Sequence, residues 1–561
     1  MRMEVSVVNK KVCSFPILFA LLALLIGTCA VVFPASAQAA PTSTGSITVS
    51  GNVARSYDAY QIFSANVVDG DGDAKIATDL AWASDAVRDA ALPVLHSAGM
   101  PNSQTTAQEA AEWLNTDSHL TSALSAQLAR SLQSSGAVSV ALNAGTTAEL
   151  PCGYWLIVAD DDVIAQDEAG TAPIMALVGG SAVTVKPKAA TPKVSKHVLE
   201  DSTAAWQKAA DATVADDLYW RLSATVPAGL TAYDTYTVQF VDTMSAGLDP
   251  SKVVASVRVY VAASSDGGFD AVSAGKDGRT GTEPTKGWTD ITAQCRVSVD
   301  GKTFTVRTGD LIAALGGADA FTAGARVVAV YNAPLNSACN HGIAKGNPNE
   351  VYLRYPRSPL ADQSGDAGFT RTPSDDACAY TWDLALTKRG SDGDKPLAGA
   401  VLSIADDRGR TLAADGTWDA EDKATVTTGE DGRVTVSGVD SGKLEVRELK
   451  APKGYTAFGG TRSVTVKAEG LDVDQVAAAK PKLTITAESP LRADSADGST
   501  GSLEASLINT PTGTPPSITT GGFMPSTGDM AMYAAAAAAV AGAALIVVAL
   551  LVKRGGGSHK E

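Results

Sequence analysis

The sequence predicts a mainly β protein in which two tandem β-sandwich domains follow a smaller domain of mixed α and β structure. Short runs of β-branched and aromatic residues, separated by turns rich in Gly, Asp and Ser, recur from about residue 192 to residue 509. Such runs are typical of antiparallel sandwiches. Leucines at helical spacing mark helices in the N-terminal part. Long apolar runs at the two ends of the chain are expected to lie outside these domains.

Residues 1–40 are predicted to be a signal peptide. Arg2, Lys10 and Lys11 precede an apolar run over residues 15–33, and small residues at 35–39 offer cleavage sites of the A-x-A kind. We therefore expect an exported protein. The chain has 61 Asp and Glu against 45 Lys and Arg, a formal net charge of -16, and no basic patch is evident in the sequence. Nucleic acid is not expected as a partner.

Residues 41–187 are predicted to form the α+β domain. Thr106 and Glu109 have the spacing of a capping box at a helix start. Acidic clusters at 69–73 and 160–162 are interpreted as hydrated turns, because the first lacks the Gly and Glu that an EF-hand loop requires, and no metal or cofactor is expected. A second helix carries an apolar stripe of Leu120, Leu124, Leu128 and Leu132. Runs with strand composition are 46–49, 59–63, 154–158 and 182–185.

Residues 188–376 and 377–510 are each predicted to form an immunoglobulin-like sandwich. The segment 266–287, rich in Gly, Asp and Thr, is expected to be a long excursion from the first of them. Strand runs in the middle domain are 218–222, 235–241, 257–261, 304–306 and 326–331. Strand runs in the last domain are 384–388, 400–404, 432–436 and 444–448.

Four cysteines lie outside the signal peptide. They are far apart and in no C-x-x-C arrangement, so a structural zinc site is not expected. An exported compartment permits disulfides, and three pairings are possible. The closest pair, Cys339 with Cys378, is preferred over pairings that involve Cys152 or Cys295.

The C-terminal end is predicted to be a membrane anchor. Residues 511–523 form a spacer rich in Pro, Thr and Gly, 530–552 a transmembrane helix, and 553–561 a cytoplasmic tail that starts with Lys-Arg. The intervening motif is Met524-Pro525-Ser526-Thr527-Gly528. It resembles the LPxTG sorting signal of Gram-positive surface proteins, which implies that a sortase cuts after Thr527 and passes its carboxyl group to an amine. A plain single-span anchor is the alternative.

The end of the first domain offers a candidate for that amine. The run Val-Thr-Val-Lys-Pro-Lys over 183–188 resembles the pilin motif of sortase-assembled shaft pilins, with Lys186 where an aromatic residue is usual. The resemblance places Lys188 on the lysine that accepts the threonyl group of the next subunit. Pro187 keeps its neighbour extended, and the surrounding linker should expose the amine. The alternative is a solvated linker lysine.

In the last domain, the run from Leu444 to Tyr455 resembles the pilin E-box and places Glu448 on its glutamate. Strand alternation puts this carboxyl on the apolar face of its strand, where it needs a partner. Lys388 and Asn509 match the first- and last-strand residues of CnaB-type domains, which form an internal Lys–Asn isopeptide bond. Neutral Lys388 would attack the Asn509 carbonyl while protonated Glu448 polarises its oxygen, and ammonia would leave. A buried Lys388–Glu448 salt bridge is the alternative.

The middle domain resembles CnaA-type pilin domains. Its opening Pro-Lys-Val-Ser-Lys makes Lys196 the amine, and the run Phe-Val-Asp-Thr-Met makes Asp242 the catalytic carboxyl. The run Tyr-Asn-Ala-Pro-Leu-Asn makes Asn336 the acceptor, with Asn349 and Asn332 as competitors.

Together these resemblances imply a structural shaft subunit of a covalently polymerised fimbria on a Gram-positive cell wall, linked from Thr527 to Lys188 of its neighbour. Its partners would be identical subunits, a sortase, peptidoglycan and tip or minor pilins. Each internal bond forms in one turnover, so an enzyme is not expected, and no hydrolase constellation is found. The alternative is a monomeric wall-anchored adhesin for a host or matrix ligand that the sequence does not name.

Overall fold

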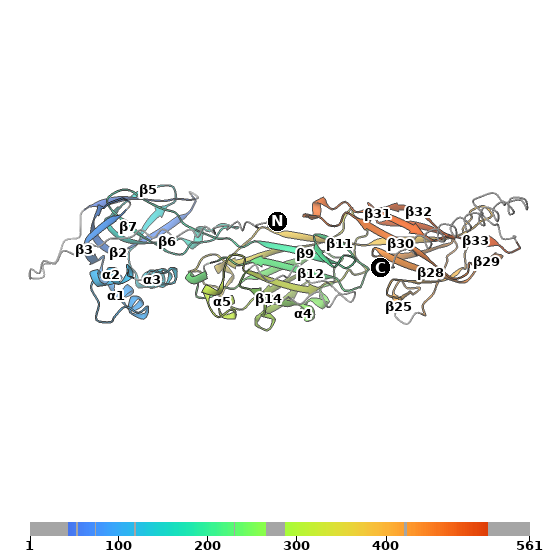
Figure 1. Ribbon diagram of the computed structural model, residues 1–561, viewed down its shortest axis with the longest axis horizontal. Coiled ribbons are helices and arrows are strands. Elements are labelled where there is room, and N and C mark those ends of the chain that lie inside the picture. Colours follow the sequence, from blue (N-terminus) through green and yellow to red (C-terminus); the bar gives the residue numbers. More distant parts are fainter. Residues whose placement is uncertain are drawn as a thin grey trace, which may run out of the picture.

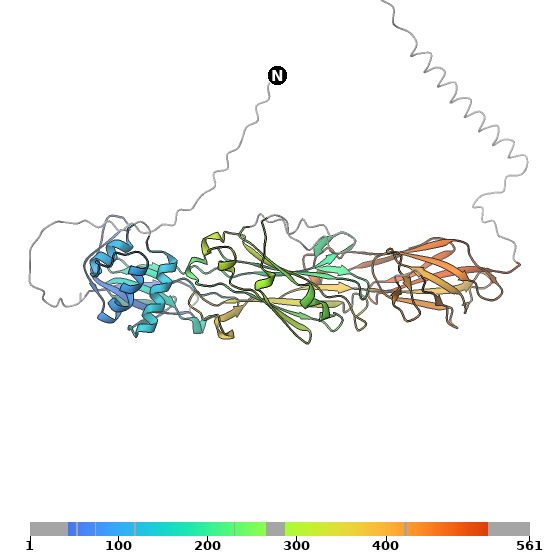
Figure 2. The ribbon, with the colours of Figure 1, turned by 90° about the horizontal axis from the view of Figure 1, so that it is seen from below.

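The computed structural model describes residues 43–51, 54–72, 74–116, 119–228, 230–264, 287–419 and 423–513. The predicted signal peptide, sorting motif, transmembrane helix, cytoplasmic tail and most of the spacer lie outside these residues, as does nearly all of the expected excursion. The described ranges contain no helix that could span a lipid bilayer. The described chain forms three bodies in a row (Figure 1), and the view from below shows the same row (Figure 2).

The N-terminal body combines two sheets with a layer of helices. One sheet has the order β5-β1-β8 and the other β3-β2-β6-β7, with β4 paired to β2. The strands are β1 (Thr44–Val49), β2 (Ser56–Asp69), β3 (Lys75–Trp82), β4 (Val140–Asn143), β5 (Thr147–Pro151), β6 (Gly153–Ala159), β7 (Ile174–Val178) and β8 (Val183–Val185). The helices are α1 (Asp85–Ser97), α2 (Ala107–Leu114) and α3 (Ser122–Ser135), which share one apolar core with β2 and β6.

Both predicted helix signals are confirmed in this body. The Thr106 hydroxyl accepts from Glu109 N, and the Glu109 side chain accepts from Thr106 N, so the capping box is complete at the start of α2. Helix α3 buries Leu124, Leu128 and Leu132, whereas Leu120 lies before it and packs on the same core. The stripe therefore faces the sheet, as its spacing predicts.

The middle body is a sandwich of two sheets. One has the order β10-β9-β12-β18-β14-β15, and the other β11-β21-β19-β13-β17-β16, with β20 paired to β19. Two short helices, α4 (Val253–Ser256) and α5 (Leu311–Ala314), lie in its connections. The strands are β9 (Val194–Glu200), β10 (Ala205–Gln207), β11 (Ala209–Asp211), β12 (Tyr219–Thr225), β13 (Gln239–Met244), β14 (Arg258–Ala262), β15 (Thr289–Asp290), β16 (Arg296–Asp300), β17 (Thr303–Arg307), β18 (Arg326–Asn332), β19 (Asn347–Pro356), β20 (Phe369–Arg371) and β21 (Asp375–Tyr380).

The third body is a second sandwich. Its sheets have the orders β27-β22-β33-β29, with β32 paired to β33, and β25-β24-β23-β28-β30-β31, with β26 paired to β23. The strands are β22 (Trp382–Gly390), β23 (Val401–Ala405), β24 (Thr411–Leu412), β25 (Trp418–Asp419), β26 (Val426–Thr427), β27 (Arg433–Val439), β28 (Gly442–Lys450), β29 (Tyr455–Thr456), β30 (Thr461–Glu469), β31 (Lys482–Ala487), β32 (Leu491–Asp497) and β33 (Ser502–Pro511).

The mainly β class and nearly all strand runs are confirmed, with three differences. Strand β13 begins at Gln239 rather than at 235, and β21 continues to Tyr380, past the predicted border at 376. Strand β19 was not predicted at all. It opens with Asn347-Pro348-Asn349, and both Asn and Pro are depleted in strands, so its composition hides it.

Neighbouring bodies are joined by specific contacts. Ala169 of the first body belongs to the core of the middle one, and the Tyr355 hydroxyl donates to Glu168 O at 3.1 Å. Between the middle and third bodies, Arg410 Nη1 lies 2.6 Å from Asp216 Oδ1. The indole of Trp382 donates to Asp211 Oδ2 at 2.6 Å.

Candidate functional site

The third body brings Lys388, Glu448 and Asn509 together from three strands. Strands β22 and β33 are parallel neighbours in one sheet, and their register sets Lys388 opposite Leu507 and Gly390 opposite Asn509. The side chains of Lys388 and Asn509 therefore lie on the same inner face of this sheet, two residues apart along the strands. Glu448 comes from β28 in the opposite sheet, where it shares a face with Leu444 and Val446.

Glu448 is the centre of this cluster. Its Oε1 lies 3.2 Å from Lys388 Nζ, and both side chains are 0% exposed. Asn509 Nδ2 donates to Oε1 at 2.9 Å and to Oε2 at 3.1 Å, and Phe458 N donates to Oε2 at 3.0 Å. Burial lowers the pKa of Lys388 to about 8, although the nearby Glu448 carboxyl acts in the opposite direction. The amine is thus far closer to its neutral form than an ordinary lysine.

The orientation of the amide differs from the expected one. Glu448 contacts the amide nitrogen of Asn509 rather than its oxygen. Asn509 Oδ1 has no hydrogen-bond partner among the described residues. The Lys388–Glu448 contact also lacks hydrogen-bond geometry, so Lys388 Nζ has no hydrogen-bond partner there either. The two groups that would react, the Lys388 amine and the Asn509 amide oxygen, therefore both lack a hydrogen-bond partner in the described chain. Such unpaired buried polar atoms are energetically costly.

The middle body contains a second cluster of the same kind. Lys196 on β9 and Tyr331 on β18 belong to one sheet, while Asp242 on β13 and Asn349 on β19 belong to the other. Asn349 lies opposite Met244, two residues from the Asp242–Val351 pair, and therefore on the same face as Asp242. Lys196, Asp242 and Asn349 are 0% exposed.

A chain of contacts joins these groups through a tyrosine. Lys196 Nζ contacts Asp242 Oδ2 and donates to Tyr331 Oη at 2.9 Å. Tyr331 Oη donates to Asp242 Oδ2 at 3.0 Å, and Asn349 Nδ2 donates to Tyr331 Oη at 2.8 Å. Burial lowers the pKa of Lys196 to about 8 and raises the pKa of Asp242, while their mutual attraction opposes both shifts. Burial therefore favours a neutral amine beside a neutral acid.

The structure does not bring the predicted acceptor Asn336 to this cluster. Its Nδ2 donates to Ala246 O and Leu248 O, both at 3.0 Å, and its Oδ1 accepts from a backbone amide two residues later. Asn332, next to Tyr331 on β18, points to the other face and donates to Asp217 Oδ1 at 2.6 Å. The amide that lies in the cluster is that of Asn349, the predicted competitor, on the unpredicted strand β19.

Sequence reasoning missed the aromatic residues around both amines. Lys196 Nζ lies 5.4 Å from the ring centres of Trp220 and Tyr331, and Lys388 Nζ lies 5.9 Å from the ring of Phe458. Strand alternation could have revealed Tyr331, because it shares a face with Val327 and Ala329 in the run 326–331. Phe458 lies in a loop, and no periodic signal marks it.

Lys188 lies between β8 and β9, in a linker without regular secondary structure that joins the first two bodies. Its side chain is exposed, and so is that of Lys186, whereas Pro187 between them is half-buried. The donor end of the predicted linkage, Thr527, lies outside the described residues with Met524, Pro525, Ser526 and Gly528.

The cysteine pairing is a wrong prediction. Cys152, Cys295, Cys339 and Cys378 are all free thiols. Cys339 Sγ lies 3.5 Å from His341 Nε2, and His341 Nδ1 lies 2.7 Å from Asp383 Oδ2. Burial raises the pKa of Cys339 to about 11, so the contacts among Cys339, His341 and Asp383 do not generate a thiolate. Among the described residues, no group of three His, Cys, Asp or Glu could hold a metal ion.

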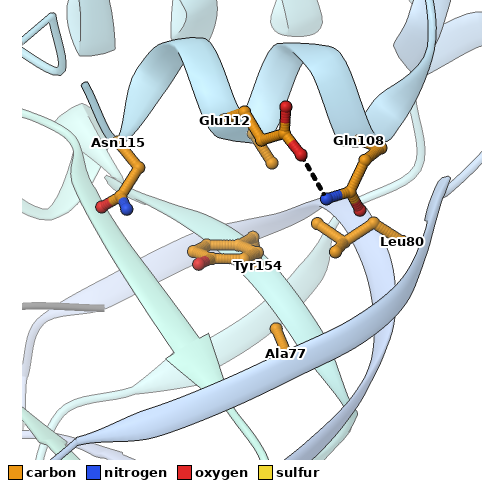
Figure 3. A pocket seen from close by; sticks show the side chains of 7 residues that line it. Ala77, Leu80, Gln108, Glu112, Asn115 and Tyr154 are labelled. Atoms are coloured by element: carbon orange, nitrogen blue, oxygen red, sulfur yellow. Dashed lines mark hydrogen bonds between the residues drawn. The ribbon is translucent and has the colours of Figure 1, made fainter. Parts of the chain in front are cut away.

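The N-terminal body contains a cavity that is too small to hold a ligand. It lies between α2 and strands β3 and β6, where Figure 3 shows Leu80 and Tyr154 facing the helix. Gln108 on that helix donates to Glu112 at 2.7 Å. The volume is about 20 Å³, which accommodates about one water molecule.

Comparison with known proteins gives matches of several kinds. Residues 383–480 match the SpaA family, described as a prealbumin-like fold domain, so this part of the third body has that fold. The Trypsin-resistant surface T6 protein of Streptococcus pyogenes serotype M6 is 30% identical over 143 residues, 24% of each chain. The match thus spans about a quarter of that relative.

Solved structures give weaker likenesses over more of the chain. The T6 backbone pilin of Streptococcus pyogenes aligns with a TM-score of 0.46 and 16% identity, over 85% of this chain and 100% of that one. The major pilin SpaD of Corynebacterium diphtheriae aligns with a TM-score of 0.40 and 15% identity, over 85% and 100%. In these comparisons the chain is similar to backbone pilins of Gram-positive bacteria.

Proposed function

We propose that this chain, which is similar to the backbone pilins of Gram-positive bacteria, is the shaft subunit of a covalent surface fimbria with an internal isopeptide bond in each sandwich. The observation that carries the proposal is the pair of buried clusters, each with an amine, a carboxyl and an amide. Two such clusters in consecutive domains favour a shared covalent chemistry.

In the third body, the neutral amine of Lys388 attacks Cγ of Asn509. The carboxyl of Glu448 takes a proton from Nζ as the new bond forms and delivers a proton to Nδ2, with which it is in contact at 2.9 Å. The Cγ–Nδ2 bond breaks and ammonia leaves, so one amide replaces another. Glu448 is restored at the end, so no cofactor is needed. Lys388 and Asn509 are consumed, so each chain reacts once.

In the middle body, Lys196 Nζ attacks Cγ of Asn349 and the Cγ–Nδ2 bond breaks. The proton has a longer path here from Nζ to Nδ2. Asp242 accepts the proton from Lys196 Nζ, and the Tyr331 hydroxyl, which bonds both Asp242 and Asn349 Nδ2, relays a proton to the leaving nitrogen. The products are again an amide and ammonia. Tyr331 thereby joins Asp242 as part of the proposed catalytic set.

A permanent salt bridge between Lys388 and Glu448 is the simpler alternative for the third body. A buried ion pair must overcome the desolvation of both charges, and it is favourable only with good geometry and further hydrogen bonds. Here the amine lacks hydrogen-bond geometry to Glu448, and the Asn509 oxygen has no hydrogen-bond partner in the described part of the chain. Bond formation removes the buried amine altogether, which favours the covalent reading.

The exposed linker amine of Lys188 suits the second half of the proposal. A sortase would join Thr527 of one subunit to Lys188 of the next, and would finally attach the polymer to peptidoglycan, with tip or minor pilins as further partners. The name of the matched T6 relative, a surface protein, agrees with a cell-surface location. The monomeric adhesin would carry the same internal bonds but would not need Lys188.

Intact-mass analysis of the purified protein tests the internal bonds. Each bond expels ammonia, so the mass should fall by about 17 Da per bond and by about 34 Da in total. Lys196→Ala and Lys388→Ala should each restore one increment after correction for the substitution. A wild-type mass equal to the sum of its residues would refute the isopeptide proposal.

The polymer needs a separate measurement. Immunoblots of wall extracts should show a ladder that resists boiling in SDS. Monomer alone in those extracts, with both internal bonds present, would favour the adhesin.

A further inference from the structure

The outer face of one middle-body sheet carries a row of arginines that the sequence does not reveal. Arg296 on β16 pairs with Arg307 on β17, which pairs with Gln239 on β13. Gln239 pairs with Arg354 on β19, and Arg354 with Arg371 on β20. Residues directly opposite one another share a face of the sheet. We call Arg296, Arg307, Arg354 and Arg371 the arginine row.

Among the described residues, Arg354 is the one member of the row with a carboxylate within salt-bridge distance. Like charges directly opposite each other destabilise a sheet, and Arg354 faces Arg371 in this way. Arg354 has a carboxylate partner, Asp366, at 2.9 Å, but that side chain is 82% exposed. Arg307 donates to a backbone oxygen, Gln363 O, at 2.6 Å. The side chains of Arg296 and Arg371 have no hydrogen-bond acceptor among the described residues.

Aromatic rings hold several of these guanidinium groups in place. Arg307 lies 5.4 Å and Arg354 5.7 Å from the ring centre of Phe369. Arg371 lies 5.1 Å from the ring centre of Tyr352. Guanidinium groups packed on rings lose little further freedom when they bind an anion, so the row is preorganised.

A pocket lies at one end of the row, at the seam between the first two bodies. Its volume is about 270 Å³, and Arg354, Arg357 and Arg371 line it together with Gln166. A segment of the first body forms one wall and is fixed there by backbone bonds, among them Asp167 N to Arg371 O at 2.9 Å. Arg357 adds a third guanidinium, and its nearest carboxylate, Asp162, lies 3.8 Å away with a side chain that is 98% exposed.

We propose that this pocket binds an oxyanion, the carboxylate, phosphate or sulfate group of a small ligand, between Arg354, Arg357 and Arg371. Guanidinium groups match such anions with paired hydrogen bonds, and a bound anion would offset the repulsion between Arg354 and Arg371. Because the wall contains Gln166 of the first body, the ligand would also tie that body to the middle one. The proposal does not depend on the isopeptide bonds or on polymerisation.

Calorimetric titration of the purified protein at constant ionic strength tests the site, with sulfate, phosphate and glucuronate as separate probes. At least one anion should bind saturably with one site per chain, and the strongest probe identifies the ligand chemistry. Arg371→Ala should weaken binding by about tenfold or more, the effect of losing charge-assisted hydrogen bonds. Arg371→Lys should also weaken it, because an ammonium cannot form the paired bonds.

Arg296→Ala is the matched control, since it removes the same charge from the far end of the row. It should leave the affinity unchanged within about twofold. Arg357→Ala should weaken binding as Arg371→Ala does, which guards against a local effect of one substitution. The absence of saturable binding for all three anions would overturn the proposal. Equal losses in the Arg296 and Arg371 variants would overturn it too, because they would indicate general charge attraction.

Discussion

Lys196 and Lys388 are lysines without access to water, and each lies beside a carboxyl and an amide. Burial alone would make such residues destabilising, because a buried cation costs free energy unless it is paired and hydrogen-bonded. Their surroundings instead favour the neutral amine, which is the nucleophilic form. The same feature that weakens a noncovalent fold thus prepares the proposed reaction.

The acceptor of the middle body can be tested at single-residue level. Asn349→Ala should raise the intact mass by about 17 Da after correction for the substitution, because the amide that releases ammonia is gone. Asn336→Ala should leave the mass deficit in place, since its side chain bonds only backbone groups of nearby loops and lies outside the cluster. The opposite pattern in the two variants would return the assignment to Asn336.

The lowered pKa of Lys388 predicts a pH dependence of stability in a chain that cannot form the third-body bond. In Asn509→Ala, folded Lys388 should lose its proton near pH 8, whereas an unfolded lysine keeps it to about pH 10.4. Between these values the unfolded state binds more protons, so raising the pH should stabilise the third body. Denaturant midpoints between pH 7 and pH 10 measure this trend.

Wild-type protein is the control for that experiment, because a lysine in an amide bond no longer titrates. Its midpoint should rise less over the same range. Parallel curves for the two proteins would mean that Lys388 titrates normally or that the wild-type bond is absent.

At the level of elements, the parallel pairing of β22 with β33 is decisive for the third body. It sets the first strand of the sandwich beside the last one, so a bond from Lys388 to Asn509 would close a loop of roughly 120 residues.

The linker between β8 and β9, by contrast, suits a reaction between two molecules. It has no regular secondary structure and leaves Lys188 exposed, so it suits a reaction with a large external enzyme.

The linker therefore predicts a specific effect on polymerisation. Lys188→Ala should collapse the SDS-resistant ladder to monomer without loss of folding, because an exposed linker lysine contributes little to stability. Lys186→Ala, two residues away and equally exposed, is the matched control and should keep the ladder. A ladder that survives in the first variant and disappears in the second would move the acceptor to Lys186.

At the level of the whole molecule, three bodies in a row place every domain in series (Figure 2). In a shaft one molecule wide, tension would pass through each of them, and a noncovalent sandwich could open under load. The proposed bonds lie in the middle and third bodies. The first body has no such cluster among its described residues and relies on its packed core and its contacts with the middle body.

Removing the third-body bond should have a global effect. Glu448→Gln is nearly isosteric but cannot transfer protons, so the loop should stay open and the third body should lose about 5 kcal/mol by the chain-entropy estimate. We expect a melting temperature lower by about 10 °C or more and faster cleavage by trypsin. Glu445→Gln, exposed on the same strand, is the control and should behave as wild type. Unchanged melting and proteolysis in Glu448→Gln would argue against a stabilising bond.

The sequence by itself determined the mainly β class, the order of the three domains and the residues of the third-body cluster. It could do so because strand alternation is local, and because Lys388, Glu448 and Asn509 each lie in a run with a recognisable pattern. The helix stripe on α3 and the capping box at Thr106 were predictable for the same reason. Such signals depend only on neighbours within a few residues.

Only the tertiary structure placed Asn349 beside Asp242 and Tyr331, left the cysteines unpaired and assembled the arginine row. Asn349 lies on a strand whose Asn and Pro content hides it, and its relation to Asp242 and Tyr331 depends on the register of strands far apart in the chain. The arginines are scattered between residues 296 and 371 and become neighbours only when five strands align. Cross-strand register depends on the hydrophobic patterns of both partner strands together, so it cannot be read from the residues of one strand alone.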